Sequence, residues 1–171
     1  AKAVNFGIVY GQTPFGLAQQ LGISNDEAAE FIARYFARYQ GVQRYIADCL
    51  SEARDTGVTR TLFGRLRQHP EINSKNGLRR SMAERTAINS PIQGTAADIV
   101  KLAMIRIDDK LRRDNLRTRM VLQVHDELIF EVPEDELGIH DRLRTLMQDV
   151  VQLSVPLTVN IKHGPNWQNL R

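Results

Sequence analysis

Cysteine is almost absent from this chain of 171 residues, because Cys49 is the only one and has no partner for an internal disulfide. The sequence also lacks any run of the roughly 18–20 apolar residues that a membrane-spanning helix needs. It contains no internal repeat and no low-complexity tract. These absences argue against a disulfide-stapled scaffold, a membrane protein and a repeat array, and they suit a reducing cytoplasm.

The composition is that of a soluble globular domain, with 42% hydrophobic and 25% charged residues and enough length to bury a core. The net charge of +3 is small but unevenly distributed. Most charged residues in 58–97 are basic, whereas residues 126–149 contain eight acidic residues and two arginines. A basic stretch near an acidic one fits a protein that brings an anionic polymer to a metal site. A solvated basic surface is the more ordinary explanation.

Three titratable residues separate two apolar stretches in the second half of the chain. Residues 120–124 and 128–132 each predict a buried strand, and His125, Asp126 and Glu127 lie between them. A turn that only reverses the chain normally contains glycine, asparagine or proline, and this one contains none. Charged groups at the tip of a rigid apolar hairpin can direct a carboxylate at a metal ion. An ordinary solvated turn explains the same residues.

The first half of the chain predicts helices. Residues 1–10 and 14–21 fit two short helices, and because nothing caps the first, we expect the chain to belong to a larger protein. Ser24 and Glu27 form a capping box before an apolar stripe that continues to Tyr39. A second stripe, over residues 42–53, ends at Gly57. We expect these two longer helices to form a packed scaffold, with Cys49 as a small core residue.

The second half predicts a mixture of strands and helices. We expect helices at 78–89, 95–111 and 134–151, and strands at 59–63, 66–68, 120–124, 128–132 and 156–161. Pro91 is expected to interrupt the helical pattern between the first two of these helices. An antiparallel sheet backed by long helices is an α+β arrangement.

Three side chains fall on one face of the first predicted helix. Lys2, Phe6 and Tyr10 are spaced four residues apart, with Gly7 and Gly11 beside them. A glycine inside a helix costs about 1 kcal/mol relative to alanine, and the close approach of a ligand could offset that cost. An ammonium group below two aromatic rings can pair with phosphates while a base stacks above. The alternative is an amphipathic helix that turns both rings toward the core.

Four motifs resemble those of the family A DNA polymerases, the group that includes bacterial DNA polymerase I, and they follow one another along the chain in the family's order. Residues 2–11 resemble the later portion of motif B on the fingers helix, and Gln123-Val124-His125-Asp126-Glu127 resembles motif C of the palm. Residues 61–65 and 85–98 also match, and the resemblance extends to Asn166-Trp167. It implies a partial fingers subdomain at 1–57 and the C-terminal part of a palm subdomain at 58–171. The implied fold is α+β, with an antiparallel palm sheet backed by long helices.

The resemblance also implies roles for individual residues. Lys2 would contact the phosphates of the incoming dNTP, Phe6 would lie beside its sugar and base, and Tyr10 would sit at the templating position. Asp126 would ligate catalytic Mg²⁺, and Glu127 would support it. Residues lining the primer–template duplex near the growing end would be Arg85, Asn89, Gln93 and His125. Phenylalanine at position 6 implies poor acceptance of dideoxynucleotides.

The residue types agree with these implied roles. Mg²⁺ prefers carboxylate and phosphate oxygens, and two such ions about 3.5–4 Å apart can stabilise both oxygens of a phosphoryl transfer. Adjacent strand residues point to opposite faces, so we favour Asp126 over Glu127 as the metal ligand. Asn89 and Gln93 can both donate to minor-groove acceptors, which every base pair presents. Helix capping around Pro91 is the alternative for these two residues.

The same resemblance indicates what the sequence does not contain. The second metal-binding aspartate of motif A, the arginine that opens motif B and the thumb have no match. One carboxylate cannot bridge two metal ions, so we expect the 171 residues alone to be inactive. We expect a cytoplasmic, nucleoid-associated polymerase of replication and repair, with primer–template DNA, dNTP and the remainder of its chain as partners. A non-catalytic nucleic-acid-binding module that keeps the fold is the alternative. A metal-dependent phosphohydrolase is disfavoured, because the other histidines are scattered.

Overall fold

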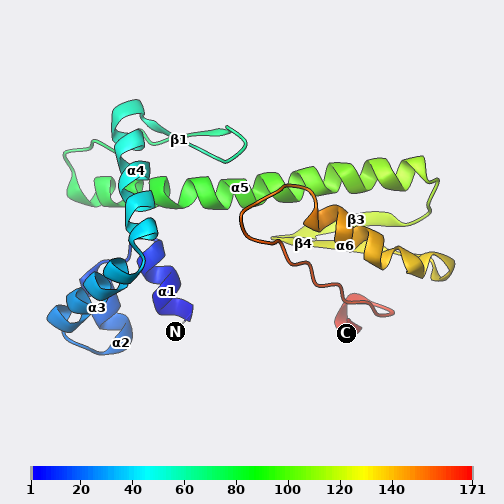
Figure 1. The fold of residues 1–171 in the computed structure, drawn as a ribbon, viewed down its shortest axis with the longest axis horizontal. Coiled ribbons are helices and arrows are strands. Elements are labelled where there is room, and N and C mark those ends of the chain that lie inside the picture. The colour runs from blue at the N-terminus through cyan, green and yellow to red at the C-terminus, as the bar shows by residue number, and fades with distance from the viewer. Residues whose placement is uncertain (1, 171) are drawn as a thin grey trace. The chain divides into compact units, whose positions relative to one another are not determined.

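The computed structural model describes the backbone of residues 2–170 and the side chains of residues 4–170. The chain divides into two compact units, Ala1–Thr95 and Ala96–Arg171 (Figure 1). The first unit contains α1 (Lys2–Val9), α2 (Pro14–Leu21), α3 (Asn25–Arg38), α4 (Gln40–Thr56), β1 (Val58–Arg60), β2 (Leu66–Gln68) and the first part of α5 (Gly77–Arg113). The second contains the rest of α5, β3 (Arg119–Val124), β4 (Glu127–Glu131), η1 (Glu134–Ile139), α6 (His140–Gln148) and η2 (Trp167–Asn169). The predicted α+β class is confirmed.

Local signals in the sequence set the starts of α2 and α3 and the end of α4. Thr13 caps α2 by accepting a hydrogen bond from Gly16 N, and Pro14 follows it at the first helical position. At the start of α3, Ser24 Oγ accepts from Glu27 N at 3.2 Å while Glu27 Oε2 accepts from Ser24 N at 2.9 Å. Gly57 ends α4 with φ at +74°, a conformation that favours glycine. The predicted helices of the first half are therefore confirmed.

Two small cores hold the first unit together. Ile8, Leu17, Ala18 and Ala28 join the first three helices in one cluster. A second cluster of buried residues joins α4 to α5 and consists of Ala53, Ile72 and Ala87. Cys49 is buried on α4, as predicted for a small core residue. Figure 1 shows α4 crossing the first part of α5.

The long helix α5 continues through Pro91, which corrects the prediction of two helices separated at this proline. Pro91 has no amide hydrogen to donate to Ala87 O, so one helical hydrogen bond is missing. Side-chain donors reach the carbonyls on either side of that acceptor. Ser90 Oγ donates to Thr86 O at 2.5 Å, and Tyr45 Oη donates to Ile88 O at 2.9 Å. These bonds support the turn that the proline weakens.

The first hairpin, β1–β2, is shorter than predicted because Thr61 begins its turn. Gly64 N donates to Thr61 O at 2.9 Å, and Gly64 takes φ +84°. Inside the hairpin, Thr59 Oγ1 and His69 Nε2 share a buried hydrogen bond of 2.8 Å. The hairpin is therefore closed by its own turn at one end and by a buried polar pair at the other.

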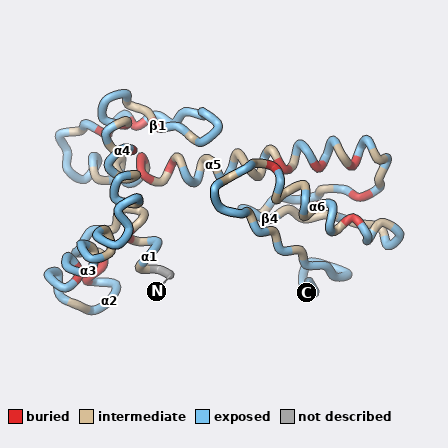
Figure 2. Tube along the Cα trace, in the orientation of Figure 1, coloured by how far each residue is buried: buried red, intermediate tan, exposed pale blue. Residues whose placement is uncertain are grey.

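In the second unit, one face of the β3–β4 hairpin packs on α5 and α6. The buried residues of this core are Ile107, Leu111, Ile139 and Leu143. Met120 and Phe130, which pair across the hairpin, pack against it. On β3, Val121 is 43% exposed at a β-bulge and Leu122 is 49% exposed. Figure 2 likewise shows no buried residue on the two strands. The prediction of buried strands is thus wrong for this chain, because only one hairpin face is covered.

The end of the chain differs from prediction in two ways. The helix predicted at 134–151 begins as the 3₁₀ segment η1, where Glu136 accepts from Arg117 N and Thr118 N at 2.8 Å each. It then continues as α6, which ends at Gln148. The strand predicted at 156–161 is not formed, although burial alternates from Leu157 to Ile161. No neighbouring strand pairs with this segment in the described chain, and a strand needs a ladder of backbone hydrogen bonds.

Within the part of the chain that the structure describes, no helix combines the length and the apolar character needed to cross a bilayer. The predicted boundary between fingers and palm at residue 57 refers to a larger fold and stays a prediction. The compact units of this chain meet at residues 95 and 96, inside α5.

Candidate metal and nucleic-acid site

The two rings predicted to bind nucleotide lie together on α1. Phe6 and Tyr10 stack with their centroids 5.9 Å apart and an interplanar angle of 26°. Phe6 is 47% exposed, whereas Ile8 is the side chain of this helix that enters the core. The alternative that both rings face the core is therefore wrong for Phe6. The side chain of Lys2 lies outside the described residues, so its role stays a prediction.

The glycines beside these rings have local causes. A Cβ at Gly7 would lie 1.9 Å from Gln12 Oε1, so the side chain of Gln12 occupies the space above this glycine. Gly11 takes φ +80° where the chain leaves α1, a conformation that L side chains rarely adopt. The interpretation that a ligand's approach explains the glycines is thus unnecessary at both positions.

The same turn brings the end of α1 against α5. A Cβ built at Gly11 would lie 3.5 Å from Ile88 Cδ1 and 3.7 Å from Arg85 Cγ. The backbone that follows Tyr10 therefore lies against the part of α5 that carries Arg85.

Arg85, Asn89 and Gln93 follow one another at four-residue spacing along α5. Arg85 and Gln93 are exposed, and Asn89 is half-buried. Because α5 has no end at Pro91, the alternative that Asn89 and Gln93 cap helix ends is wrong. Asn89 Oδ1 is buried and has no hydrogen-bond partner in the structure. A polar atom in that state is costly, and such cases call for an explanation.

The tip of the first hairpin holds α5 just beyond these residues. Arg65 Nη2 donates to Gly94 O at 2.9 Å, and Leu62 N donates to Thr95 Oγ1 at 2.8 Å. A Cβ at Gly94 would lie only 2.6 Å from Thr61 Cγ2, so only glycine fits without a shift. Arg65 therefore anchors the hairpin tip on α5, a role that the sequence analysis did not predict. The motif at residues 61–65 marked the hairpin tip in the sequence but did not indicate that this tip contacts α5.

The charged turn is tighter than predicted. Val124 pairs with Glu127, so only His125 and Asp126 form the turn and Glu127 is the first residue of β4. His125 takes φ +56°, and Gln123 Nε2 donates to its carbonyl at 3.1 Å. A left-handed conformation costs a residue other than glycine about 1–2 kcal/mol. Strain of this kind clusters at functional sites.

Half of the eight acidic residues in 126–149 have ion-pair partners, and Glu136, which pairs with Arg117 at 3.5 Å, is one of them. Glu131 pairs with Arg119 at 2.7 Å, Asp135 pairs with Arg117, and Asp141 pairs with Arg144 at 2.6 Å. Half of the acidic run predicted to meet a metal is therefore engaged in ion pairs.

The two acidic residues at the tip of the β3–β4 hairpin differ from those in ion pairs. Asp126 and Glu127 are exposed, and among the described residues no hydrogen bond or ion pair involves their carboxylates. Two unpaired carboxylates at the tip of a hairpin suit Mg²⁺, which prefers such oxygens. The described residues contain no group of three or more histidine, cysteine or acidic side chains placed to hold a metal ion. Further ligands would therefore be phosphate, water or groups from elsewhere in the protein.

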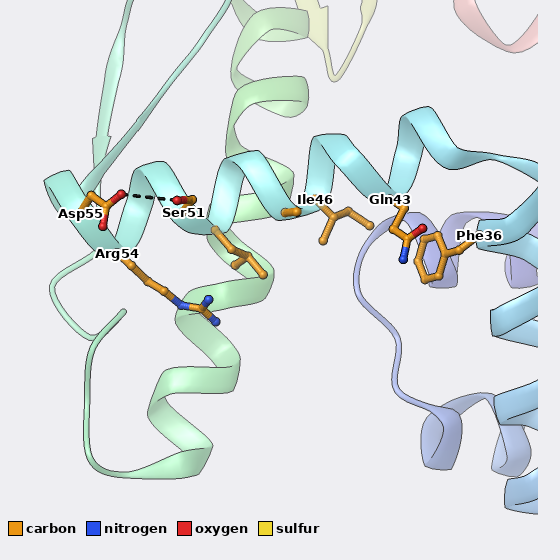
Figure 3. A pocket seen from close by; sticks show the side chains of 8 residues that line it. Phe36, Gln43, Ile46, Ser51, Arg54 and Asp55 are labelled. Carbon is orange, nitrogen blue, oxygen red and sulfur yellow. Dashed lines mark hydrogen bonds between the residues drawn. The ribbon is translucent and has the colours of Figure 1, made fainter.

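A depression of about 440 Å³ lies between α3 and α4, and none of the predicted site residues lines it (Figure 3). It is lined by the apolar residues Phe36, Ile46, Ala47 and Leu50 and by the polar residues Gln43, Ser51, Arg54 and Asp55. It contains no group suited to acid–base or metal chemistry beyond the single carboxylate of Asp55. The depression therefore adds nothing to the candidate site.

Comparison with known proteins gives the chain its family. The family model for DNA polymerase family A matches residues 1–169. The chain belongs to DNA polymerase family A. Curated relatives of this family include DNA polymerase I of Streptococcus pneumoniae, 51% identical over 168 residues, and DNA polymerase I of Geobacillus stearothermophilus, 51% identical over 172 residues. These matches cover 98% and 100% of the chain but only 19% and 20% of the relatives, so the chain spans about a fifth of their length.

A solved structure of the same family supports the fold. The polymerase domain of Pol1 from M. smegmatis, in complex with DNA primer-template and dNTP, is similar with a TM-score of 0.87 and 48% identity. The match covers 91% of this chain and 28% of that one. The resemblance found in the motifs is therefore confirmed over nearly the whole chain.

Proposed function

We propose that this chain takes part in template-directed DNA synthesis as a portion of a larger DNA polymerase I. The reaction joins a dNTP to a primer 3′-hydroxyl and releases pyrophosphate. The observation that carries the proposal is the family match over residues 1–169, together with similarity to a polymerase domain solved with primer-template and dNTP. Primer–template DNA, dNTP and the remainder of the polymerase are the partners that follow from it.

The helical residues would bind and orient the substrates. Phe6 offers an exposed ring against which the nucleotide base and sugar can lie, and stacking of a base on such a ring is worth about 1–3 kcal/mol. Lys2 would neutralise the triphosphate, and Tyr10 would limit the space at the templating position. Because Gly11, at the end of α1, lies against α5 beside Arg85, the templating base and the duplex would meet at the junction of α1 and α5.

Asn89 and Gln93 would test the shape of the newest base pairs. Both can donate to minor-groove acceptors, which have the same position in every correct pair and a different one in a mispair. Such contacts report pair geometry without reading sequence. The donor in this contact would be Asn89 Nδ2, whereas the buried acceptor Oδ1 would take no part in it. His125 would contact the duplex from the charged turn, and Arg85 would contact phosphate or sugar.

Asp126 would be a metal ligand, and Glu127 would support it. Bound Mg²⁺ supplies charge neutralisation for the attacking and leaving oxygens, with two ions in the complete enzyme. The chain's own part is to hold the carboxylate of Asp126 on a turn that Gln123 and the β3–β4 pairing keep rigid. Asp126, Glu127 and Lys2 are the catalytic set of this proposal.

We further propose that residues 1–171 alone do not synthesise DNA, because the described part offers one acidic turn rather than a complete ligand set. The same observation favours a second function, a non-catalytic nucleic-acid-binding module. Primer extension by the full-length protein separates the two. With Mg²⁺, all four dNTPs and two templates of different sequence, the proposal expects products whose sequence follows each template. DNA binding without any extension would favour the binding module instead.

A further inference from the structure

Tyr45 donates a hydrogen bond to the one stretch of α5 where the helical ladder is broken. Pro91 leaves Ala87 O without its amide donor, and Tyr45 Oη reaches the next carbonyl, Ile88 O, at 2.9 Å. The bond crosses from α4 to α5 and joins residues 43 positions apart in the sequence. Burial raises the pKa of the Tyr45 hydroxyl, so it remains a donor at all physiological pH values.

The carbonyl that Tyr45 holds belongs to the residue before Asn89. Among the described residues, no hydrogen bond locks the side chain of Asn89, and its Oδ1 is buried without a partner. The direction of this amide therefore depends on the backbone at positions 88 and 89. The helix is also held by the packing of Gly11 against Ile88 on one side, and by the hairpin at Gly94 on the other. Between these two contacts, Tyr45 is the donor from another element that reaches the weakened turn.

We propose that Tyr45 is a positioning residue that sets the backbone under Asn89, and through it the discrimination between matched and mismatched primer ends. The inference rests on the proposed polymerase function. Loss of the hydroxyl leaves Ile88 O without that donor and lets the weakened turn relax, so Asn89 no longer meets the groove of a correct pair at a fixed place. A mispair loses little when the Tyr45 hydroxyl is removed, because its minor-groove acceptors are already displaced from the place that Asn89 reaches. The expected change is a smaller preference for correct pairs.

The test is primer extension by the full-length protein from matched and mismatched termini, with kcat/KM measured for each. Tyr45→Phe is expected to lower the matched-to-mismatched ratio about 3–10-fold, the effect of one hydrogen bond. Tyr39→Phe is the control, because Tyr39 is 52% exposed and its hydroxyl has no hydrogen bond within the described chain. This variant is expected to keep the wild-type ratio.

A double-mutant cycle separates positioning from general stability. Asn89→Ala is expected to lower the ratio on its own, and adding Tyr45→Phe to it is expected to change nothing further, because Tyr45 acts through Asn89. Pro91→Ala restores an amide donor to the turn and is expected to return the ratio of Tyr45→Phe toward wild type. If Tyr45→Phe alone fails to fold, as judged by thermal melting, Pro91→Ala in the wild-type background is tested in its place: because it restores an amide donor to the turn, its ratio is expected to equal or exceed that of the wild type, and a lower ratio would overturn the inference.

An unchanged ratio in Tyr45→Phe, or additive losses in the cycle, would overturn the inference while leaving the proposed function in place. A wild-type protein that binds primer-template but extends neither terminus would instead overturn the proposed function, and this inference with it.

Discussion

The two regions proposed to meet the substrates are supported in different ways. Residues 85–95 of α5 are held by packing and hydrogen bonds from three other parts of the first unit, namely Gly11, Tyr45 and the hairpin tip. Among the described residues, the β3–β4 turn at Asp126 is held by its own hairpin and by Gln123 alone, and its strands are covered on one face. One region takes its geometry from tertiary contacts, and the other takes it from local backbone conformation.

This difference has a physical consequence for each kind of residue. Asn89 and Gln93 need a surface of defined shape, which a helix supported from several sides provides. Asp126 needs an unpaired, exposed carboxylate, and a bare turn provides that at the cost of strain at His125. Substitutions in the first region should therefore act through packing, and those in the second through the turn itself.

Gly94→Ala should have the largest effect on stability. The added Cβ would lie 2.6 Å from Thr61 Cγ2, so the hairpin tip has to move, at a cost of about 1–3 kcal/mol. Gly41→Ala is the control, because Gly41 lies in α4 with nothing within 4 Å of its added Cβ, and it should gain about 0.5–1 kcal/mol. Urea unfolding measures both. Equal changes in the two variants would contradict the anchoring of the hairpin on α5.

His69 should make the stability of the first unit sensitive to acid. Burial, helped by the nearby charge of Arg67, lowers the pKa of His69 below its usual 6.5. The unfolded chain therefore binds this proton more readily, so the stabilising contribution is complete above about pH 6.5 and is lost as the pH falls. The free energy of unfolding, measured by urea between pH 7.5 and 5.5, should fall less in His69→Gln than in the wild type. Parallel curves would remove His69 as the cause.

His125→Gly should have the smallest effect, and in the opposite direction. Glycine adopts φ +56° without strain, so the hairpin should gain about 0.5–1 kcal/mol while primer-template affinity falls. Asn115→Gly is the control, because Asn115 also has a positive φ, of 51°, but asparagine tolerates this conformation. It should change stability less and leave DNA affinity unaltered. A destabilised His125→Gly would show that the turn holds the histidine by contacts rather than under strain.

The sequence predicted the parts of the structure that local signals control. The capping box at Ser24, the glycine end of α4 and the position of the charged turn all follow from residues close together in the chain. The unbroken α5 was not predictable, because its support at Ile88 O comes from Tyr45, which is distant in sequence. The exposed strand faces and the unpaired segment at 156–161 also depend on distant partners, which periodicity does not reveal. For the same reason the motifs named Arg85, Asn89 and Gln93 but not the residues that hold them.

Single-turnover primer extension by Asp126→Asn in the full-length protein tests the central claim most directly. Asp149→Asn is the matched control, because its carboxylate lies in the same acidic run, and among the described residues no ion pair involves it. The account predicts a loss of about a thousandfold or more in the rate for Asp126→Asn, with primer-template affinity nearly unchanged, and a normal rate for Asp149→Asn. A wild-type rate in Asp126→Asn would contradict it.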